Sequence, residues 1–121
     1  GYRPFLETRA LDVIQPDLCS CGGITEGKKI CDLAYTYEVS VQPHLCGSPI
    51  AAAAALQLEA AIPNFLIHEH HEIALKDYNR ELCIYDYQPS GGVLPIPDLP
   101  GIGQELSPRA MEEAALKVTV K

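Results

Sequence analysis

The chain has 121 residues, of which 47% are hydrophobic and 21% charged, a balance typical of a globular protein rather than a disordered one. Acidic residues outnumber basic ones by 16 to 9, for a net charge of −7. A nucleic-acid partner would require a basic face, so we expect none. The longest apolar run, residues 50–56, is far shorter than the roughly 20 residues of a membrane span, and no secretory signal is visible. We therefore expect no membrane partner.

Five cysteines are spread along the chain at positions 19, 21, 31, 46 and 83. Only the first two are close together, as Cys-x-Cys, and no second pair follows at the spacing of a zinc finger. An odd number of unpaired thiols is typical of a reducing compartment. We therefore expect free thiols and a cytoplasmic location.

The first half of the chain alternates between short apolar runs and helical patterns. A run near 11–16 ends at a proline and predicts a buried strand, and a turn with Gly22 and Gly23 follows it. A helical pattern opening at Thr25 comes next, and a second strand is predicted near 39–43. Strand, turn, helix and strand in this order indicate a βα unit.

The same alternation continues beyond the second strand. Ser48 and Pro49 have the residue types of an N-cap and a first helical position, and an alanine-rich helix to about Ala61 should be buried on most of its circumference. A third strand is predicted near 65–69. The strand ends fall near residues 16, 43 and 68, a regular repeat that indicates an α/β fold with a parallel sheet. It fits a (β/α)₈ barrel sector or a piece of an open doubly wound sheet.

The character of the sequence changes after Glu72. A short helix is predicted over 75–82, a proline-rich arm over 93–103, and a final helix from Ser107 to about Lys117. We divide the chain into βα units over 1–92 and a C-terminal arm and helix over 93–121. Three βα units cannot close a barrel and would leave unpaired strand edges, so we expect the chain to be part of a longer protein.

A titratable residue follows each predicted strand: Asp17, His44 and Glu69. In parallel α/β folds the chemistry lies at the carboxyl ends of the strands. An aspartate beside a histidine orients the imidazole and fixes its tautomer, which suits a general acid or base. Each residue taken alone also has an ordinary explanation, as a turn former or an exposed loop side chain. Their recurrence on successive strand ends favours a site.

The run from His68 to His71 invites a metal interpretation. Side chains alternate along a strand, so Glu69 and His71 would share one face and His68 and His70 the other. The run does not match the His-Glu-x-x-His signature. We expect exposed imidazoles at a strand end rather than a metal site.

Several segments together resemble one family, the mandelate racemase and muconate lactonizing enzyme branch of the enolase superfamily. The resemblance covers residues 8 to 106. Within this branch the sequence is most similar to the galactonate dehydratase group of sugar-acid dehydratases. The matching segments are those of the family's sixth strand (14–17 and 22–26), its seventh (41–44), its eighth (65–69) and the arm that returns to its capping domain (96–103). The implied fold is the C-terminal portion of a (β/α)₈ barrel, about three βα units plus a C-terminal arm and helix.

The resemblance also implies roles for the three strand-end residues. His44 would be the general acid that protonates a departing hydroxyl, Asp17 its dyad partner, and Glu69 a hydrogen-bonding partner of the substrate carboxylate or enediolate. The family reaction removes the proton alpha to a carboxylate, holds the enediolate on Mg²⁺ and expels water, leaving a 2-keto-3-deoxy acid. The implied substrate is an acid sugar and the implied enzyme class is a hydro-lyase.

The family's metal ligands, its third-strand base and its capping domain would all lie upstream of Gly1. The resemblance therefore implies Mg²⁺ in the parent enzyme, none bound by this chain alone, and no turnover by the chain alone. The missing N-terminal part would be one partner and a second copy of the chain another. Two alternatives remain open: a racemase or cycloisomerase of the same superfamily, and a non-catalytic module that self-associates through its open strand edges.

Overall fold

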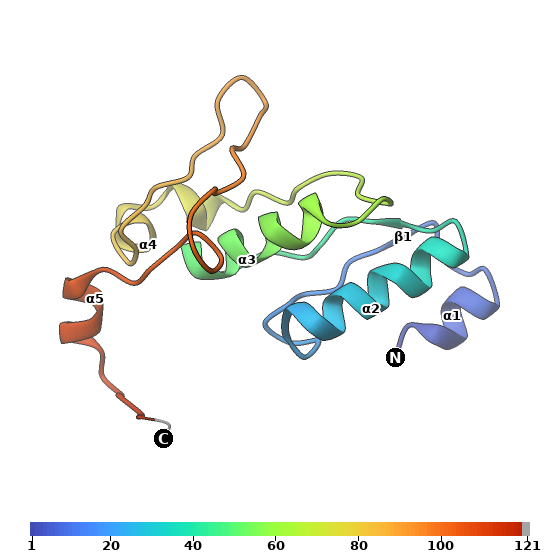
Figure 1. Cartoon of the computed structure of the whole chain (residues 1–121), viewed down its shortest axis with the longest axis horizontal. Helices are drawn as coiled ribbons and strands as arrows, with labels where there is room; N and C mark the ends of the chain where they lie inside the picture. The colour runs from blue at the N-terminus through green and yellow to red at the C-terminus, as the bar shows by residue number, and fades with distance from the viewer. Residues whose placement is uncertain (120–121) are drawn as a thin grey trace.

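The computed structural model describes residues 1–119 as short helices and strands in an elongated arrangement (Figure 1). No helix within these residues has the length and apolarity needed to cross a membrane. The elements, in chain order, are α1 (Arg3–Glu7), β1 (Val13–Ile14), α2 (Gly23–Thr36), β2 (Ser40–Val41), α3 (Pro49–Ala60), the 3₁₀ helix η1 (Glu72–Leu75), α4 (Asp77–Arg80) and α5 (Pro108–Glu113).

The strands form a parallel layer that is shorter than the sequence predicts. β1 pairs with β2 in the register Val13 to Ser40 and Ile14 to Val41. The predicted third strand is reduced to one parallel bridge, between Val41 and Phe65. The spatial order of these segments therefore follows the chain order, with each crossover through a helix. That is the topology of successive βα units, and α2 and α3 lie on the same side of the strands (Figure 1).

Helix α2 starts earlier than predicted, at Gly23 rather than Thr25. Its N-cap is Gly22, whose φ of 109° lies in the left-handed region that favours glycine. The second glycine of the predicted turn is therefore the first residue of the helix, and Gly22 is its N-cap. The buried face of α2 packs into a core shared with both strands and α3, formed by Leu6, Ile14, Cys31, Ala34, Val39, Val41, Leu58 and Ile62.

Helix α3 follows its prediction closely. It begins at Pro49 after Ser48, which has an extended conformation, and it ends at Ala60. Every residue from 49 to 59 is at least partly buried, as its alanine-rich sequence predicts. One of these residues is charged: Glu59 is only 7% exposed.

The second half differs most from the predicted elements. In place of one helix over 75–82, the structure has η1 and α4. The arm forms only isolated bridges, and the last helix ends at Glu113 instead of near Lys117 because Ala114 leaves the helical conformation. Ser107 does cap this helix, accepting a hydrogen bond from the Ala110 N–H at 3.2 Å. Helix α1 was not predicted.

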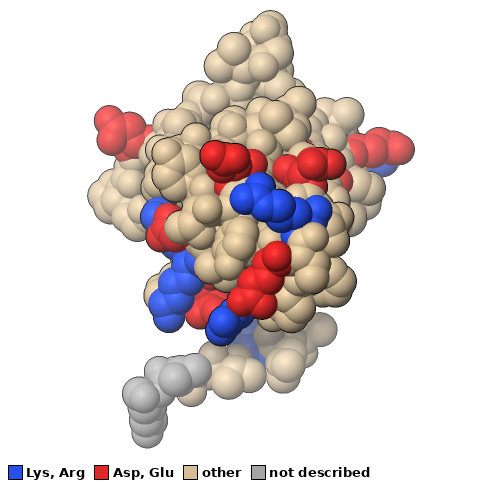
Figure 2. Space-filling view, turned by 90° about the vertical axis from the view of Figure 1, so that its right-hand side faces the viewer, with Lys and Arg blue, Asp and Glu red and all other residues tan. Residues whose placement is uncertain are grey.

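Acidic and basic side chains are mixed over the end of the molecule that carries α1 and α2 (Figure 2). Several of them pair along one helix, as in Arg3 with Glu7 at 2.7 Å and Lys28 with Asp32 at 2.5 Å. Exposed pairs of this kind contribute little to stability. This face presents no separate basic patch.

Candidate functional site

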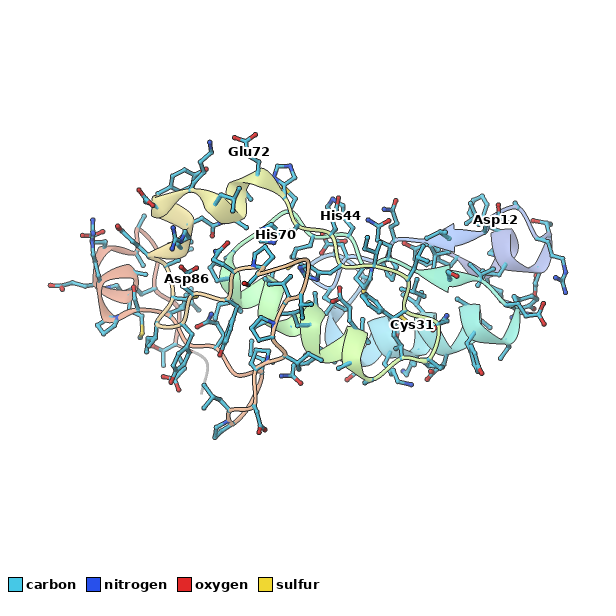
Figure 3. The ribbon with its side chains drawn as sticks, turned by 90° about the horizontal axis from the view of Figure 1, so that it is seen from above. Asp12, Cys31, His44, His70, Glu72 and Asp86 are labelled. Carbon is cyan, nitrogen blue, oxygen red and sulfur yellow. The ribbon has the colours of Figure 1, made fainter. Side chains whose placement is uncertain are left out.

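The backbone pairing of β1 with β2 continues past the strands and brings Asp17 beside His44. The Gln42 N–H donates to the Ile14 carbonyl at 3.0 Å, and the His44 N–H donates to the Pro16 carbonyl at 3.2 Å. His44 Nδ1 then lies 2.7 Å from Asp17 Oδ2. Figure 3 shows the His44 side chain projecting from this edge, and it is 46% exposed. Two residues that are distant in sequence thus form a dyad.

Asp17 is held through both of its carboxylate oxygens. Oδ1 accepts the Cys19 N–H at 2.6 Å while Oδ2 contacts the imidazole. Burial by itself raises the pKa of Asp17, but the hydrogen bonds from His44 and the Cys19 N–H and the attraction of the His44 charge outweigh it and lower the pKa below its usual value. Asp17 is therefore ionised at neutral pH and fixes the orientation of the imidazole.

Glu69 joins the dyad indirectly. Its Oε2 accepts the Leu45 N–H at 2.7 Å, so the carboxylate is bonded to the residue directly after His44. The pairing of the third segment with β2 sets up this contact, since the Leu66 N–H donates to the Val41 carbonyl at 2.9 Å. The structure thus brings the three predicted residues to one strand edge, with Asp17 and His44 in direct contact and Glu69 beside them.

Behind Glu69 lies a buried ion pair that was not predicted. His68 Nδ1 is 3.0 Å from Glu59 Oε1 and 2.9 Å from Oε2, and the two side chains are 11% and 5% exposed. The expectation of an exposed imidazole is wrong for His68. The signal was a glutamate within the alanine-rich helix, because a buried carboxylate needs a partner.

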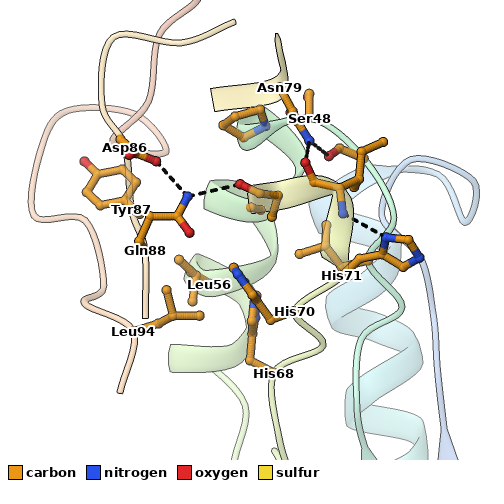
Figure 4. Close-up of a pocket in the computed structure, with 16 residues that line it drawn as sticks. Ser48, Leu56, His68, His70, His71, Asn79, Asp86, Tyr87, Gln88 and Leu94 are labelled. Carbon is orange, nitrogen blue, oxygen red and sulfur yellow. Dashed lines mark hydrogen bonds between the residues drawn. The ribbon is translucent and has the colours of Figure 1, made fainter. Parts of the chain in front are cut away.

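His70 lies on the same side of the segment as His68, with 6.3 Å between ring centroids, as strand alternation predicts (Figure 4). Burial first and the nearby His68 second lower the pKa of His70. Its Nε2 is buried and makes no hydrogen bond within residues 1–119. His71, in contrast, is exposed and accepts the Ile73 N–H at the start of η1 through its own Nδ1.

The larger hollow near these histidines is a mostly apolar cavity of about 480 Å³ between the third strand segment and the arm. His68 and His70 line it together with Leu56, Phe65 and Leu94. Asp17, His44 and Glu69 do not line this cavity, nor the smaller one in Figure 4. The candidate site is therefore an open edge, with the cavities on the opposite side of the Glu69 strand segment.

The side chains of this edge do not suit a divalent metal. Across residues 1–119, no three His, Cys, Asp or Glu side chains converge as metal ligands would. Magnesium prefers several oxygen ligands in octahedral geometry. Here Asp17 has both oxygens occupied by His44 and the Cys19 N–H, and Glu69 has one occupied by Leu45. The residues present do not form a magnesium cage.

Residues 1–110 match the sequence model of the enolase C-terminal domain-like family. The chain belongs to this family. Its α/β architecture is the C-terminal part of the family's (β/α)₈ barrel, about three βα units followed by an arm and helix. The resemblance drawn from the strand-end motifs is confirmed.

Curated relatives in the family act on sugar acids or their lactones. The chain is 41% identical over 112 residues to D-xylonate dehydratase of Haloferax volcanii, covering 93% of this chain and 27% of that protein. It is 36% identical to D-galactonate dehydratase of Ralstonia nicotianae (87% and 29% covered) and 34% identical to D-galactarolactone cycloisomerase of Agrobacterium fabrum (93% and 32%). The chain thus spans under a third of the length of these relatives.

Solved structures of the superfamily superimpose closely on the chain. A member from Salmonella Typhimurium gives a TM-score of 0.91 at 57% identity, over 93% of this chain and 29% of that one. An enolase from Pantoea ananatis with bound D-gluconate and magnesium gives 0.82 at 28% identity, over 93% and 27%. The arrangement of strands, helices and arm seen here therefore recurs within larger enzymes.

Proposed function

We propose that this chain supplies the general-acid side of the active site of a sugar-acid dehydratase. The observation that carries the proposal is the 2.7 Å contact between His44 Nδ1 and Asp17 Oδ2 at the carboxyl ends of neighbouring parallel strands. Strand ends are where barrels of this kind place catalytic groups. The sugar-acid dehydratases among the relatives support the choice of reaction.

In the proposed reaction His44 acts through the nitrogen that faces away from Asp17. Ionised Asp17 accepts the Nδ1–H, and in the imidazolium form Nε2 carries the second proton, which faces the substrate. When the carbon–oxygen bond beta to the carboxylate breaks, that proton goes to the departing hydroxyl and water leaves. The electrons for this step come from the α-carbon, whose proton is taken by a base outside these residues. The enol that remains tautomerises to a 2-keto-3-deoxy acid.

Glu69 would bind the substrate rather than transfer a proton. Its Oε2 is bonded to the Leu45 N–H, which leaves Oε1 as the oxygen that faces the substrate. In the carboxylic-acid form it would donate a hydrogen bond to the carboxylate or enediolate oxygen. Its position beside His44 would set the distance between the substrate carboxyl group and the departing hydroxyl.

Magnesium and the base would come from outside these residues. The Pantoea ananatis enolase with bound magnesium and D-gluconate supports a metal in the superfamily. The edge formed by Asp17, His44 and Glu69 lacks the ligands to hold one. We accordingly expect the 121-residue chain, mixed with Mg²⁺ and a panel of acid sugars, to yield no 2-keto acid. Turnover by the chain alone would refute this expectation.

The proposal is tested by His44→Asn in a full-length enzyme that carries this sequence. Asparagine keeps a nitrogen donor where Nδ1 meets Asp17, but it has no counterpart of the Nε2 acid. We expect kcat for acid-sugar dehydration to fall by about 10²–10⁴-fold with an unchanged melting temperature. A variant that retains near-normal kcat would remove His44 from the mechanism.

A second candidate reaction is cycloisomerisation, favoured by the 34% identity to the Agrobacterium fabrum cycloisomerase. Such an enzyme would use the same strand ends on a lactone and lose no water. Product analysis separates the two reactions. A 2-keto-3-deoxy acid formed from a free sugar acid supports the dehydratase, whereas an isomer of unchanged mass formed from a lactone supports the cycloisomerase.

We also propose that an N-terminal part of the barrel pairs with the exposed strand edge of this chain. The edge at Phe65, Leu66 and Ile67 is 42–57% exposed, and residues 93–119 would return towards a capping domain. A non-catalytic alternative is self-association through the same edge. Sedimentation of the isolated chain separates them: a dimer abolished by Leu66→Lys supports self-association, and a monomer supports completion by an N-terminal part.

A further inference from the structure

The strand end that carries Glu69 is tied to helix α3 from behind. His68 and Glu69 are consecutive, and their side chains point to opposite sides, as expected for an extended backbone. His68 turns towards α3 and meets both carboxylate oxygens of Glu59, at 3.0 and 2.9 Å. Glu69 turns towards β2 and meets the Leu45 N–H at 2.7 Å. Because the two residues are consecutive, a rotation of the backbone that moved one side chain would also move the other.

We propose that Glu59 and His68 are a positioning pair for the candidate site: by holding the strand end against α3, they direct Glu69 to the Leu45 N–H beside His44. The role of this pair in catalysis depends on the dehydratase function proposed above. The pair itself does not touch the dyad, and it acts only through the backbone between residues 68 and 69.

Burial makes this pair an energetically demanding contact. The His68 and Glu59 side chains are 11% and 5% exposed, so neither has bulk water as an alternative partner. With the carboxylate as acceptor, Nδ1 is the protonated ring nitrogen and the imidazole plane is fixed. A buried histidine–carboxylate pair is a poor source of net stability even in its charged form, because desolvation offsets the attraction. Its presence is better explained by the orientation it imposes.

The surroundings leave few other ways to orient the segment. The bridge between Val41 and Phe65, with its Leu66 N–H bond to Val41, ties it to β2 before Glu69. The Asn64 side-chain amide adds bonds to the Cys31 and Val39 carbonyls at 3.2 and 2.9 Å. Phe65, Leu66 and Ile67 are themselves exposed. On the other side lies the cavity of about 480 Å³, which both Glu59 and His68 line. The Glu59–His68 contact is thus the side-chain hydrogen bond that ties this strand end to α3.

The test uses a full-length enzyme that carries this sequence, with ¹⁵N-leucine labelling so that the amide resonance of Leu45 is read. An amide that donates to a carboxylate resonates downfield and shifts when that carboxylate is protonated, so the Leu45 amide reports directly on Glu69. The decisive variant is Glu59→Leu combined with His68→Leu. It removes both polar side chains and leaves neither partner buried alone, which favours retention of the fold. Two further variants serve as controls: Glu59→Gln, which keeps an acceptor for Nδ1–H, and Leu58→Ala, which weakens the adjacent core but keeps the pair.

We expect the Leu45 amide resonance to move upfield in the double variant and to keep its position in Glu59→Gln and Leu58→Ala. An unchanged Leu45 resonance in the double variant would overturn the proposal, as would an equal change in Leu58→Ala. If the double variant does not fold, Glu59→Ala read at the same resonance decides in its place. No substrate is involved, so failure of the dehydratase assay and failure of this test are separate results.

Discussion

Almost every buried apolar side chain in residues 1–119 belongs to the first 62 residues, from Leu6 to Ile62, and beyond them only Cys83 and Pro97 join the group. The second half exposes many large apolar side chains instead, including Leu75, Val93 and Met111. The first half is therefore organised by its own hydrophobic core. The second half is attached to the first through polar and backbone contacts. Many of its apolar side chains are not covered by any other part of residues 1–119.

Side-chain amides supply part of these contacts, both between the two halves and within the second half. Gln57 Nε2 donates to the Pro97 carbonyl at 2.8 Å, and Asn79 Nδ2 donates to the Gly47 and Ile73 carbonyls at 3.1 Å each. Gln104 exchanges two hydrogen bonds with the Tyr85 backbone, at 2.7 and 3.2 Å. Hydrogen bonds are directional, so they fix the path of the chain, but each adds only about 1 kcal/mol. The comparison predicts a rigid half and a loosely held half.

The largest effect should come from truncating matched isoleucines in the two halves. Ile14 is 1% exposed and Ile84 is 51% exposed. We expect Ile14→Ala to lower the free energy of unfolding by about 2–5 kcal/mol, because it leaves a cavity in the core. Ile84→Ala should change it by less than about 0.5 kcal/mol. Denaturant unfolding measures both, and similar losses would contradict the division into two halves.

Removing one amide tie should loosen the second half without unfolding the first. Asn79 is 3% exposed, and Asn79→Ala removes the side-chain donor to the Gly47 carbonyl and one of the two donors to the Ile73 carbonyl, which keeps the Lys76 N–H. We expect a local cost of about 1–3 kcal/mol. Hydrogen exchange should speed up over residues 72–88 and stay unchanged in α2. Equal acceleration in both places would show that the halves unfold as one unit.

Each half also has one carboxylate with a lowered pKa. In Asp86 the hydrogen bond from Arg80 is the main cause, and in Asp17 the bonds from His44 and Cys19 outweigh burial. A pKa that is lower in the folded state gives stability that is present above the unfolded pKa of about 3.9 and is lost as the pH falls through the folded value. Acid titration of the unfolding free energy should therefore be flatter in Asp17→Asn. Asp86→Asn should flatten only the pH dependence of the free energy of local opening in the second half.

The smallest effect concerns thiol reactivity at neutral pH. Burial chiefly raises the pKa of Cys31 to about 11, and burial also raises that of Cys83. Exposed Cys19 and Cys46 should react first with a thiol reagent, then Cys83 and last Cys31. Cys83 precedes Cys31 because the second half opens more readily. Mass spectrometry over time gives the order of reaction. If Cys31 reacted before Cys83, the second half would not be the more loosely held one.

Prediction from sequence worked where a local pattern had a single physical solution. Pro49 after Ser48 and a run of alanines have few alternatives to a buried helix, and α3 has nearly its predicted limits. Prolines 16 and 43 end their strands at matching heights, so Asp17 and His44 could be expected side by side, and they are in contact. Their catalytic roles, with that of Glu69, remain predictions.

Prediction was poorer where the outcome depended on distant partners. The run from 65 to 69 has the composition of a strand but forms only one bridge, because its partner β2 extends over Ser40–Val41 alone. The final helix stops at Glu113, since the residues beyond it have no surface to pack against within residues 1–119. His68 was expected to be exposed because nothing in its own segment shows that Glu59 reaches it.

The sequence by itself determined the α/β class, the order of the βα units and the family, because short-range periodicity and strand-end motifs are local properties of the chain. The tertiary structure alone decided which polar groups meet: Asp17 with His44, Glu69 with the Leu45 N–H, and Glu59 with His68. Those contacts join residues on different elements, and their geometry depends on the register of β1 against β2 and on the packing of α3.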